Sequence, residues 1–227
     1  VLHAAMQDLQ SDAAEDILEA AHWDEAGCAF NAGILVFLPK KASTEDEHGF
    51  PVFLPSDTRP LCVVDASNRL LASAARLRWE GALAKWISPE QRGFLPQRSM
   101  LANVVDLEEA AMQATLQEDN PAILLFDFAA AFPSISQRFL MRVLAHVGFP
   151  PSALNLVRSL YFKHTGRPVI AGHGGKDFPL SAGIRQGCPL SLLLYVVAAD
   201  GILRRMRRAS PSTTTRAYAD DTAAVIV

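Results

Sequence analysis

The chain has 227 residues, of which 50% are hydrophobic, and a formal net charge of −3 at pH 7. This length and apolar content suffice to bury the core of one large domain or two small ones, and no apolar run reaches the length of a membrane span. The acidic balance argues against binding nucleic acid by overall attraction, because phosphate contacts normally require a basic face.

Residues 1–30 are rich in Ala, Asp and Glu, with weak helical periodicity, and we treat them as a helical flank without an assigned role. They lack the basic-then-apolar pattern of a signal peptide, which predicts an intracellular protein, cytoplasmic or nuclear, that is neither secreted nor membrane-bound. Cys28, Cys62 and Cys188 are widely spaced. We therefore expect free thiols and no structural zinc site.

Two short apolar runs, Ile34 to Leu38 and Val52 to Leu54, predict strands joined by a polar hairpin loop. From Asn68 to Ile87 the apolar residues recur at helical spacing, and Pro89 ends the pattern. A second helix is expected from about Met100 to Leu116.

The segment from Pro121 to Phe128 is a continuous apolar run interrupted only by Asp127 near its end. This pattern is typical of a buried central strand that delivers one carboxylate. The next helix is expected to be capped by Ser134 or Ser136 and to end at Gly148.

A further helix is expected over about 152–162, and residues 169–170 and 178–180 predict a strand pair around a glycine-rich turn. Pro189 suits the first residue of a long apolar helix. Near the end, Arg216 to Tyr218 and Ala223 to Val227 predict two strands joined by the acidic turn Asp220-Asp221. Strands and helices alternate irregularly, which favours an α+β fold.

If the strand ending at Asp127 lies beside this turn, three carboxylates meet and repel one another unless cations are present. Hard divalent cations such as Mg²⁺ prefer oxygen ligands, and two of them about 3.5–4 Å apart can activate a hydroxyl and stabilise a leaving oxygen. Each acid also has an ordinary explanation, because Asp127 could cap a helix and Asp-Asp is common in turns.

The residues around these acids favour the catalytic interpretation. Three segments resemble, in order and separation, the motifs of reverse transcriptases of non-LTR (LINE-like) retrotransposons and their group II intron relatives: 126–128 with Ala131-Phe132, 185–191, and 218–221. The resemblance extends upstream through 38–41, 59–61 and 87–94. It implies a right-hand polymerase with fingers in 31–118 and an antiparallel palm sheet flanked by helices in 119–227, of which 136–180 pack partly on the fingers.

The resemblance implies that Asp127 and Asp220 bind two Mg²⁺ ions, for which Mn²⁺ could substitute. Asp221 would lie beside them, completing the catalytic set, and the Phe128 carbonyl would be a further metal ligand. The ring of Phe132 would lie under the incoming sugar and exclude a 2′-hydroxyl, whereas the alternative is an ordinary core phenylalanine.

Gln186 and Gly187 would contact the nucleotide and template, because glycine permits close backbone approach. Four cations are implied at phosphates: Arg59 and one of Lys40 or Lys41 at the triphosphate, and Arg98 and Arg185 at the nucleic-acid backbone. Arginine would act as a planar fork and lysine as a point charge. The alternative for each is a surface cation.

The leading hypothesis is an RNA-directed DNA polymerase that uses an RNA template, a DNA primer and deoxynucleoside triphosphates. Ala130 and Pro133 depart from the family pattern, and the chain stops at Val227 before any thumb. We therefore expect this fragment to be weak or inactive alone. The main alternative is an inactive retroelement relic that keeps the fold and weak nucleic-acid binding; an RNA-dependent RNA polymerase ranks lower because of Phe132.

Overall fold

The computed structural model describes residues 30–40, 44–117 and 120–227. The expected helical flank, apart from its last residue, lies outside this range, as do Cys28 and Lys41. Cys62 and Cys188 are buried free thiols, which confirms the prediction for these two. No helix of the described ranges is both long enough and apolar enough to cross a lipid bilayer.

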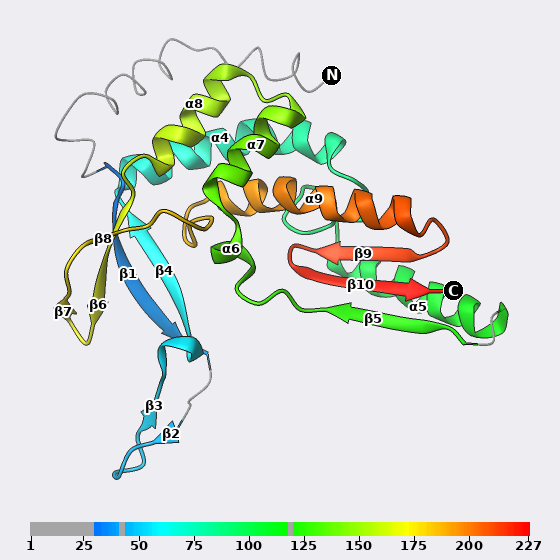
Figure 1. Ribbon diagram of the computed structural model, residues 1–227, viewed down its shortest axis with the longest axis horizontal. Helices are drawn as coiled ribbons and strands as arrows, with labels where there is room; N and C mark the ends of the chain where they lie inside the picture. Colours follow the sequence, from blue (N-terminus) through cyan, green and yellow to red (C-terminus); the bar gives the residue numbers. More distant parts are fainter. Residues whose placement is uncertain (1–29, 41–43, 118–119) are drawn as a thin grey trace.

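The first sheet has five strands, in which β1 lies between β4 and β6, and β6 also pairs with β7 and β8. Its strands are β1 (Ala32–Pro39), β4 (Thr58–Val64), β6 (Thr165–Ile170), β7 (His173–Gly174) and β8 (Phe178–Pro179). The β1–β4 pair is antiparallel and the β1–β6 pair is parallel. Figure 1 shows this sheet on the opposite side of the molecule from the C-terminus.

One predicted pairing in this sheet is wrong, and another is present at other residues than expected. Strand β1 pairs with β4 rather than with the apolar run at Val52, because β4 offers a ladder along almost the whole strand, from Gly33 to Pro39. Val52 belongs to β3 (Pro51–Val52), which pairs with β2 (Thr44–Glu45) in a separate two-stranded sheet. The strand that contains residues 169–170 does pair with β8, as predicted, but through Gly166 and Phe178, whereas Ile170 pairs with β7.

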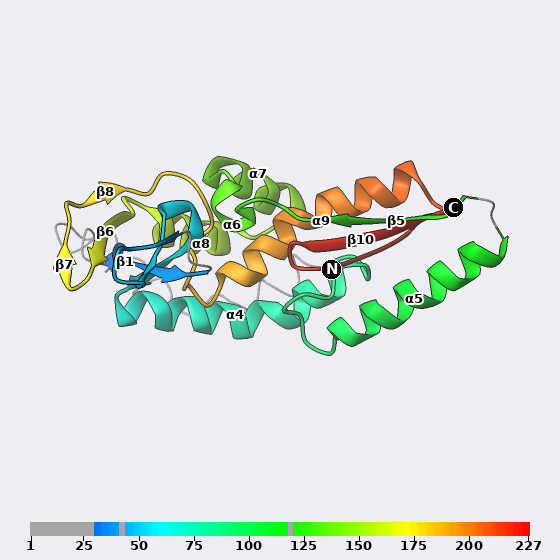
Figure 2. The same cartoon turned by 90° about the horizontal axis from the view of Figure 1, so that it is seen from below.

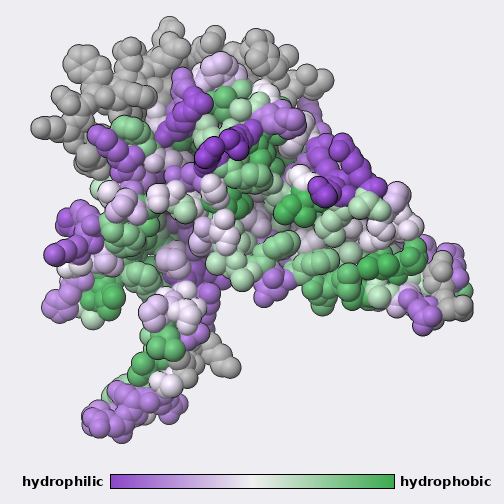
Figure 3. Space-filling view, in the orientation of Figure 1, coloured by the Kyte–Doolittle hydropathy of each residue, from purple (hydrophilic) through white to green (hydrophobic). Residues whose placement is uncertain are grey.

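The second sheet consists of β5 (Ala122–Phe126), β10 (Asp221–Ile226) and β9 (Thr214–Tyr218), all antiparallel and in that order. The strands predicted on both sides of the acidic turn are therefore present. Strand β5 is not the buried central strand that its apolar sequence predicts. It is an edge strand whose residues are all exposed, Leu125 to 81%, and Figure 3 shows the resulting hydrophobic patch.

The α-helices are α4 (Ala66–Trp86), α5 (Met100–Gln117), α6 (Ala131–Ser134), α7 (Gln137–Val147), α8 (Pro151–Tyr161) and α9 (Ser191–Ala209), and η1 (Pro55–Asp57) is a short 3₁₀ turn. Of the two predicted caps, Ser136 caps α7 by accepting a hydrogen bond from the Phe139 N–H, and Gly148 ends the helix in the left-handed region, as predicted. Helix α9 begins two residues after Pro189, which lies in the preceding turn rather than at the first helical position.

Helix α9 is the centre of the larger core. Leu193, Leu194, Val196 and Val197 on this helix are at most 1% exposed and pack with residues of α4, α7 and α8. Helix α5 contacts β9 and β10, and α9 contacts β9, so the second sheet lies between two helical layers, as Figure 2 shows from below. This packing fixes the acidic hairpin relative to the rest of the molecule.

Candidate active site

The three aspartates lie at one end of the second sheet. The β5–β10 ladder ends with the pair Phe126 and Thr222, so Asp127 and Asp221 are the next residues along these adjacent strands. Asp220 occupies the turn between β9 and β10, whose closing pair is Tyr218 and Asp221. The described part of the chain offers none of the three carboxylates a hydrogen-bonding or ion-pairing partner.

Tyr195 on α9 connects the acidic turn with Phe132, and the sequence interpretation missed it because it occupies an ordinary apolar helix position. Its ring stacks on Phe132 with 4.4 Å between centroids and 19° between planes. Burial, with the charges of Asp220 and Asp221 acting in the same direction, raises the pKa of Tyr195 to about 12. Phe132 therefore stacks on the residue whose pKa the acids of the turn raise.

The segment around Gln186 and Gly187 lies against β4 of the first sheet. The Cys62 N–H donates to the Gln186 carbonyl at 2.9 Å. Gly187 has φ +102°, and a Cβ there would lie 2.8 Å from the Cys62 carbonyl oxygen, so glycine is required for both its conformation and its close approach. The Ile184 N–H donates to the Phe132 carbonyl at 2.8 Å, which links this segment to the ring.

Arg59 and Lys40 lie on the first sheet. Arg59 is an exposed residue of β4 opposite Leu38 on β1. Lys40 is exposed directly after β1, and its backbone N–H donates to the Asp57 carbonyl at 2.9 Å. Both side chains are therefore accessible to a ligand, whereas Lys41 lies outside the described residues.

Arg98 and Arg185 have partners inside the protein. The Arg98 guanidinium donates to the carbonyls of Ala84, Ile87, Ser88 and Gln91 at the end of α4. Arg185 is 4% exposed, and its guanidinium donates to the Asn68 side chain at 3.0 Å and to the Leu160 carbonyl. In this structure both guanidinium groups bind within the protein, and their contact with a nucleic-acid backbone stays a prediction.

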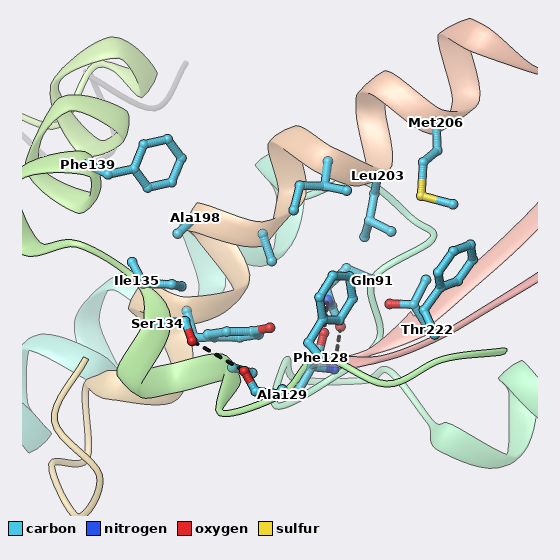
Figure 4. A pocket seen from close by; sticks show the side chains of 16 residues that line it. Gln91, Phe128, Ala129, Ser134, Ile135, Phe139, Ala198, Leu203, Met206 and Thr222 are labelled. Atoms are coloured by element: carbon cyan, nitrogen blue, oxygen red, sulfur yellow. Dashed lines mark hydrogen bonds between the residues drawn. The ribbon is translucent and has the colours of Figure 1, made fainter. Parts of the chain in front are cut away.

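A largely apolar cavity of about 420 Å³ lies beside the acidic hairpin, between α9 and the end of β5. Figure 4 shows Phe128, Leu203 and Met206 on its wall, with Thr222 of β10 nearby. The Phe128 side chain thus belongs to this apolar wall, next to the carboxylate of the preceding residue in the chain.

Comparison with known proteins decides the family. The profile of the family described as "Reverse transcriptase (RNA-dependent DNA polymerase)" matches residues 38–227. The chain belongs to the reverse transcriptases. Its relatives are proteins of non-LTR retrotransposons, in agreement with the motifs around Asp127, Gln186 and Asp220.

Two relatives are each 26% identical to this reverse transcriptase. The "Transposon TX1 uncharacterized 149 kDa protein" of Xenopus laevis matches over 192 residues, which are 85% of this chain and 14% of that protein. The "Retrovirus-related Pol polyprotein from type-2 retrotransposable element R2DM" of Drosophila melanogaster matches over 194 residues, which are 82% of this chain and 17% of that protein. The chain therefore spans only a small part of these relatives.

Solved telomerase structures have the same fold. Apo telomerase from Candida tropicalis gives a TM-score of 0.61 at 10% identity over 94% of this chain and 43% of that chain. Telomerase from Candida albicans, solved with a fragment of telomeric RNA, gives 0.52 at 13% identity over 93% of this chain and 41% of that chain. At this identity the likeness supports the polymerase fold alone.

Reverse transcriptases use divalent metal ions, and the acids at this end of the second sheet fit such an ion in the chemistry of their oxygens. Carboxylate oxygens are the ligands that hard divalent cations prefer, and those of Asp127, Asp220 and Asp221 are free of protein partners. Among the described residues, however, no three His, Cys, Asp or Glu side chains gather into a group that could hold a metal ion. The carboxylates would have to converge when an ion binds.

Proposed function

We propose that this chain is the polymerase part of a retrotransposon reverse transcriptase, which adds deoxynucleotides to the 3′-hydroxyl of a DNA primer on an RNA template. The observation that carries the proposal is the sheet register. Asp127 and Asp221 are the next residues beyond the paired residues Phe126 and Thr222, and Asp220 lies in the adjoining turn. The primer hydroxyl attacks the α-phosphate of the nucleotide, and pyrophosphate leaves.

Asp127 and Asp220 hold the divalent ions in this proposal, with Asp221 and the Phe128 carbonyl beside them. Two Mg²⁺ ions held there, or Mn²⁺ in their place, would supply activation of the attacking hydroxyl and stabilisation of the leaving oxygen. The free carboxylates at the sheet edge support this role, since like charges that lack protein partners favour binding of a cation.

Phe132 selects the sugar. Its stack on Tyr195, which is 5% exposed, holds the ring in one orientation beside the acidic turn. A ring fixed in this way excludes a 2′-hydroxyl by steric contact, which a mobile side chain would not do. Tyr195 thereby supports the selection without itself touching the nucleotide.

The first sheet supplies the nucleotide-binding cations. Arg59, with Lys40 or Lys41, binds the triphosphate, and Gln186 and Gly187 contact the nucleotide and template. The contact of Gly187 with β4 supports this arrangement, since it joins the two regions. Residues 31–118 then correspond to the fingers and 119–227 to the palm, with 136–180 packing partly on the fingers.

Primer extension tests the proposal. An RNA template, a DNA primer, deoxynucleotides and Mg²⁺ are incubated with this chain and with the chain extended as in its retrotransposon relatives, each with and without Asp220→Asn. We expect incorporation by the extended protein and a loss of at least about 100-fold in Asp220→Asn, because a metal-binding charge is removed. Asp177→Asn, which alters an exposed aspartate of the first-sheet region, is the matched control and should retain activity.

A second candidate is a relic that retains the fold and binds nucleic acid without catalysis. It is favoured by the absence, among the described residues, of a side-chain group gathered for a metal ion. Template binding by folded extended protein, with no incorporation under any Mg²⁺ or Mn²⁺ concentration, would identify this candidate and reject the polymerase.

A further inference from the structure

We infer that Gln91 is a positioning residue for the catalytic hairpin, an inference that rests on the proposed role of Asp220. The buried side-chain amide of Gln91 clamps both peptide groups of Ala219 and so fixes the backbone that carries Asp220. Gln91 lies in the connector between α4 and α5, more than a hundred residues before the hairpin in the sequence.

Both the oxygen and the nitrogen of the Gln91 side-chain amide form hydrogen bonds. It is 0% exposed. Its Oε1 accepts hydrogen bonds from the N–H groups of Ala219 and Gly93, both at 2.8 Å, and its Nε2 donates to the Ala219 carbonyl at 3.0 Å. Figure 4 shows the Gln91 side chain, with dashed hydrogen bonds, beside the cavity. The amide thus satisfies the N–H and the C=O of a single turn residue, as a neighbouring strand would.

Ala219 needs such support. Its φ is +58°, in the left-handed region that an L-residue other than glycine occupies at a cost of roughly 1–2 kcal/mol. A strained turn residue persists where the surrounding structure holds it, and strain of this kind often occurs at functional sites. Here the bonds from Gln91 hold it.

The residues around Gln91 fit the same hairpin. The backbone N–H of Arg92 donates to the Ala217 carbonyl, and the Ala217 N–H donates to the Glu90 carbonyl, both at 2.8 Å. The ring of Phe94 packs on Tyr218 with 5.5 Å between centroids. The segment 90–94 therefore lies along β9 as far as the turn.

The backbone of Gln91 is itself anchored. Arg98 donates to its carbonyl at 2.5 Å and to the Ser88 carbonyl at 2.6 Å. Ser88 in turn donates through both its N–H and its hydroxyl to the buried carboxylate of Asp200 on α9. The clamp therefore connects the acidic turn to the most buried helix of the core.

The orientation of the Asp220 carboxylate depends on this clamp, because Asp220 has no side-chain partner in the described residues. The peptide group between Ala219 and Asp220 is planar, so fixing the Ala219 carbonyl fixes the plane from which Asp220 extends. Without Gln91 that peptide could rotate to a less strained turn. A displacement of about 1 Å at a reacting centre can cost about 100-fold in rate.

The test uses the extended protein with Gln91→Met, which removes all three hydrogen bonds at similar volume, and Gln91→Glu, which keeps the accepting oxygen and loses the donor. Gln113→Met is the matched control, because the Gln113 side chain is exposed on α5 and, within the described ranges, bonds only Glu109 of the same helix. Hydrogen exchange of peptides covering 216–222 and 191–209, Mn²⁺ binding followed by electron paramagnetic resonance, and the kcat and KM of primer extension are measured.

In Gln91→Met we expect exchange in 216–222 to be at least about tenfold faster, with 191–209 unchanged, Mn²⁺ affinity about tenfold weaker, and kcat reduced while the KM for primer and template stays constant. In Gln91→Glu we expect the Ala219 N–H to stay protected from exchange and kcat to fall less than in Gln91→Met. Gln113→Met should match the unsubstituted protein in every measurement.

A folded Gln91→Met protein with unchanged exchange, Mn²⁺ affinity and kcat would overturn the assignment. If Gln91→Met does not fold, Gln91→Glu decides, since a folded variant with full kcat would show that the donor bond to the Ala219 carbonyl is dispensable. If the unsubstituted protein incorporates no nucleotide, the proposed function fails, whereas the exchange and Mn²⁺ comparisons still test the clamp.

Discussion

Replacing Gly93 with alanine tests how tightly the connector fits against the acidic turn. A Cβ at this position would lie 2.2 Å from the Ala219 nitrogen and 2.9 Å from the Ala219 Cα. These are main-chain atoms of a hairpin held on both sides, so they cannot rotate away as a flexible side chain would. Either the connector or the turn must move.

Forcing additional atoms into a packed site costs about 1–3 kcal/mol, and contact with backbone atoms places Gly93→Ala at the upper end, about 3 kcal/mol. For a chain of this size we expect the melting temperature to fall by roughly 6–12 °C. The matched substitution is Gly81→Ala in the middle of α4, where a Cβ would meet nothing within 4 Å. It should stabilise the protein by about 0.5–1 kcal/mol, because alanine is the better helix former.

Urea and thermal unfolding followed by circular dichroism measure both variants against the unsubstituted chain. The two substitutions add the same methyl group and should shift the midpoint in opposite directions. A Gly93→Ala protein as stable as the unsubstituted one would refute the close packing of connector and turn, and with it the geometric basis for the Gln91 clamp.

Three further predictions concern other parts of the molecule. Phe132→Ala should raise the kcat/KM for ribonucleotides relative to deoxynucleotides by at least about tenfold in single-nucleotide incorporation, because one ring contact of about 1.4 kcal/mol is worth that factor. Burial lowers the pKa of His164, whose Nε2 lies 3.4 Å from the Cys62 sulfur, from 6.5 to about 3, with a smaller effect of the Arg185 charge in the same direction. The neutral imidazole therefore contributes stability above pH 6.5 that is lost as the pH falls towards 3, and His164→Leu should flatten the unfolding free energy over that window in urea titrations at successive pH values. Arg98→Lys should destabilise the protein by about 2–3 kcal/mol in urea unfolding, since an ammonium cannot reach the four carbonyls that the guanidinium fork binds; an unchanged midpoint would contradict this role.

The local elements follow closely from the sequence. The helical spacing of apolar residues predicts α4 and α5 to within two residues at each end, and the turn chemistry of Asp220-Asp221 predicts the β9–β10 hairpin. Gly148 and a cap at Ser134 or Ser136 were predicted as helix ends because capping depends on hydrogen bonds within a few residues, and the structure has Ser136. The order of the motifs predicts the family, which the comparison confirms.

Strand partners and burial were harder to predict. An apolar run shows that burial would stabilise a strand, but it does not show which element buries it. For this reason β5 was expected at the centre of its sheet, whereas it lies exposed at the edge. The partner of β1 was wrong for a related reason, since both candidate runs have suitable residues and only the longer ladder distinguishes them.

The sequence by itself determined the local elements, the acids and the family, because these depend on neighbouring residues and on short motifs. Only the tertiary structure decided which long-range partners each polar group has. Gln91 and Arg98 resemble surface residues of a loop, yet one holds the turn before Asp220 and the other binds the carbonyls at the end of α4. Buried polar groups must find partners, and those partners are fixed by packing between segments that lie far apart in the chain.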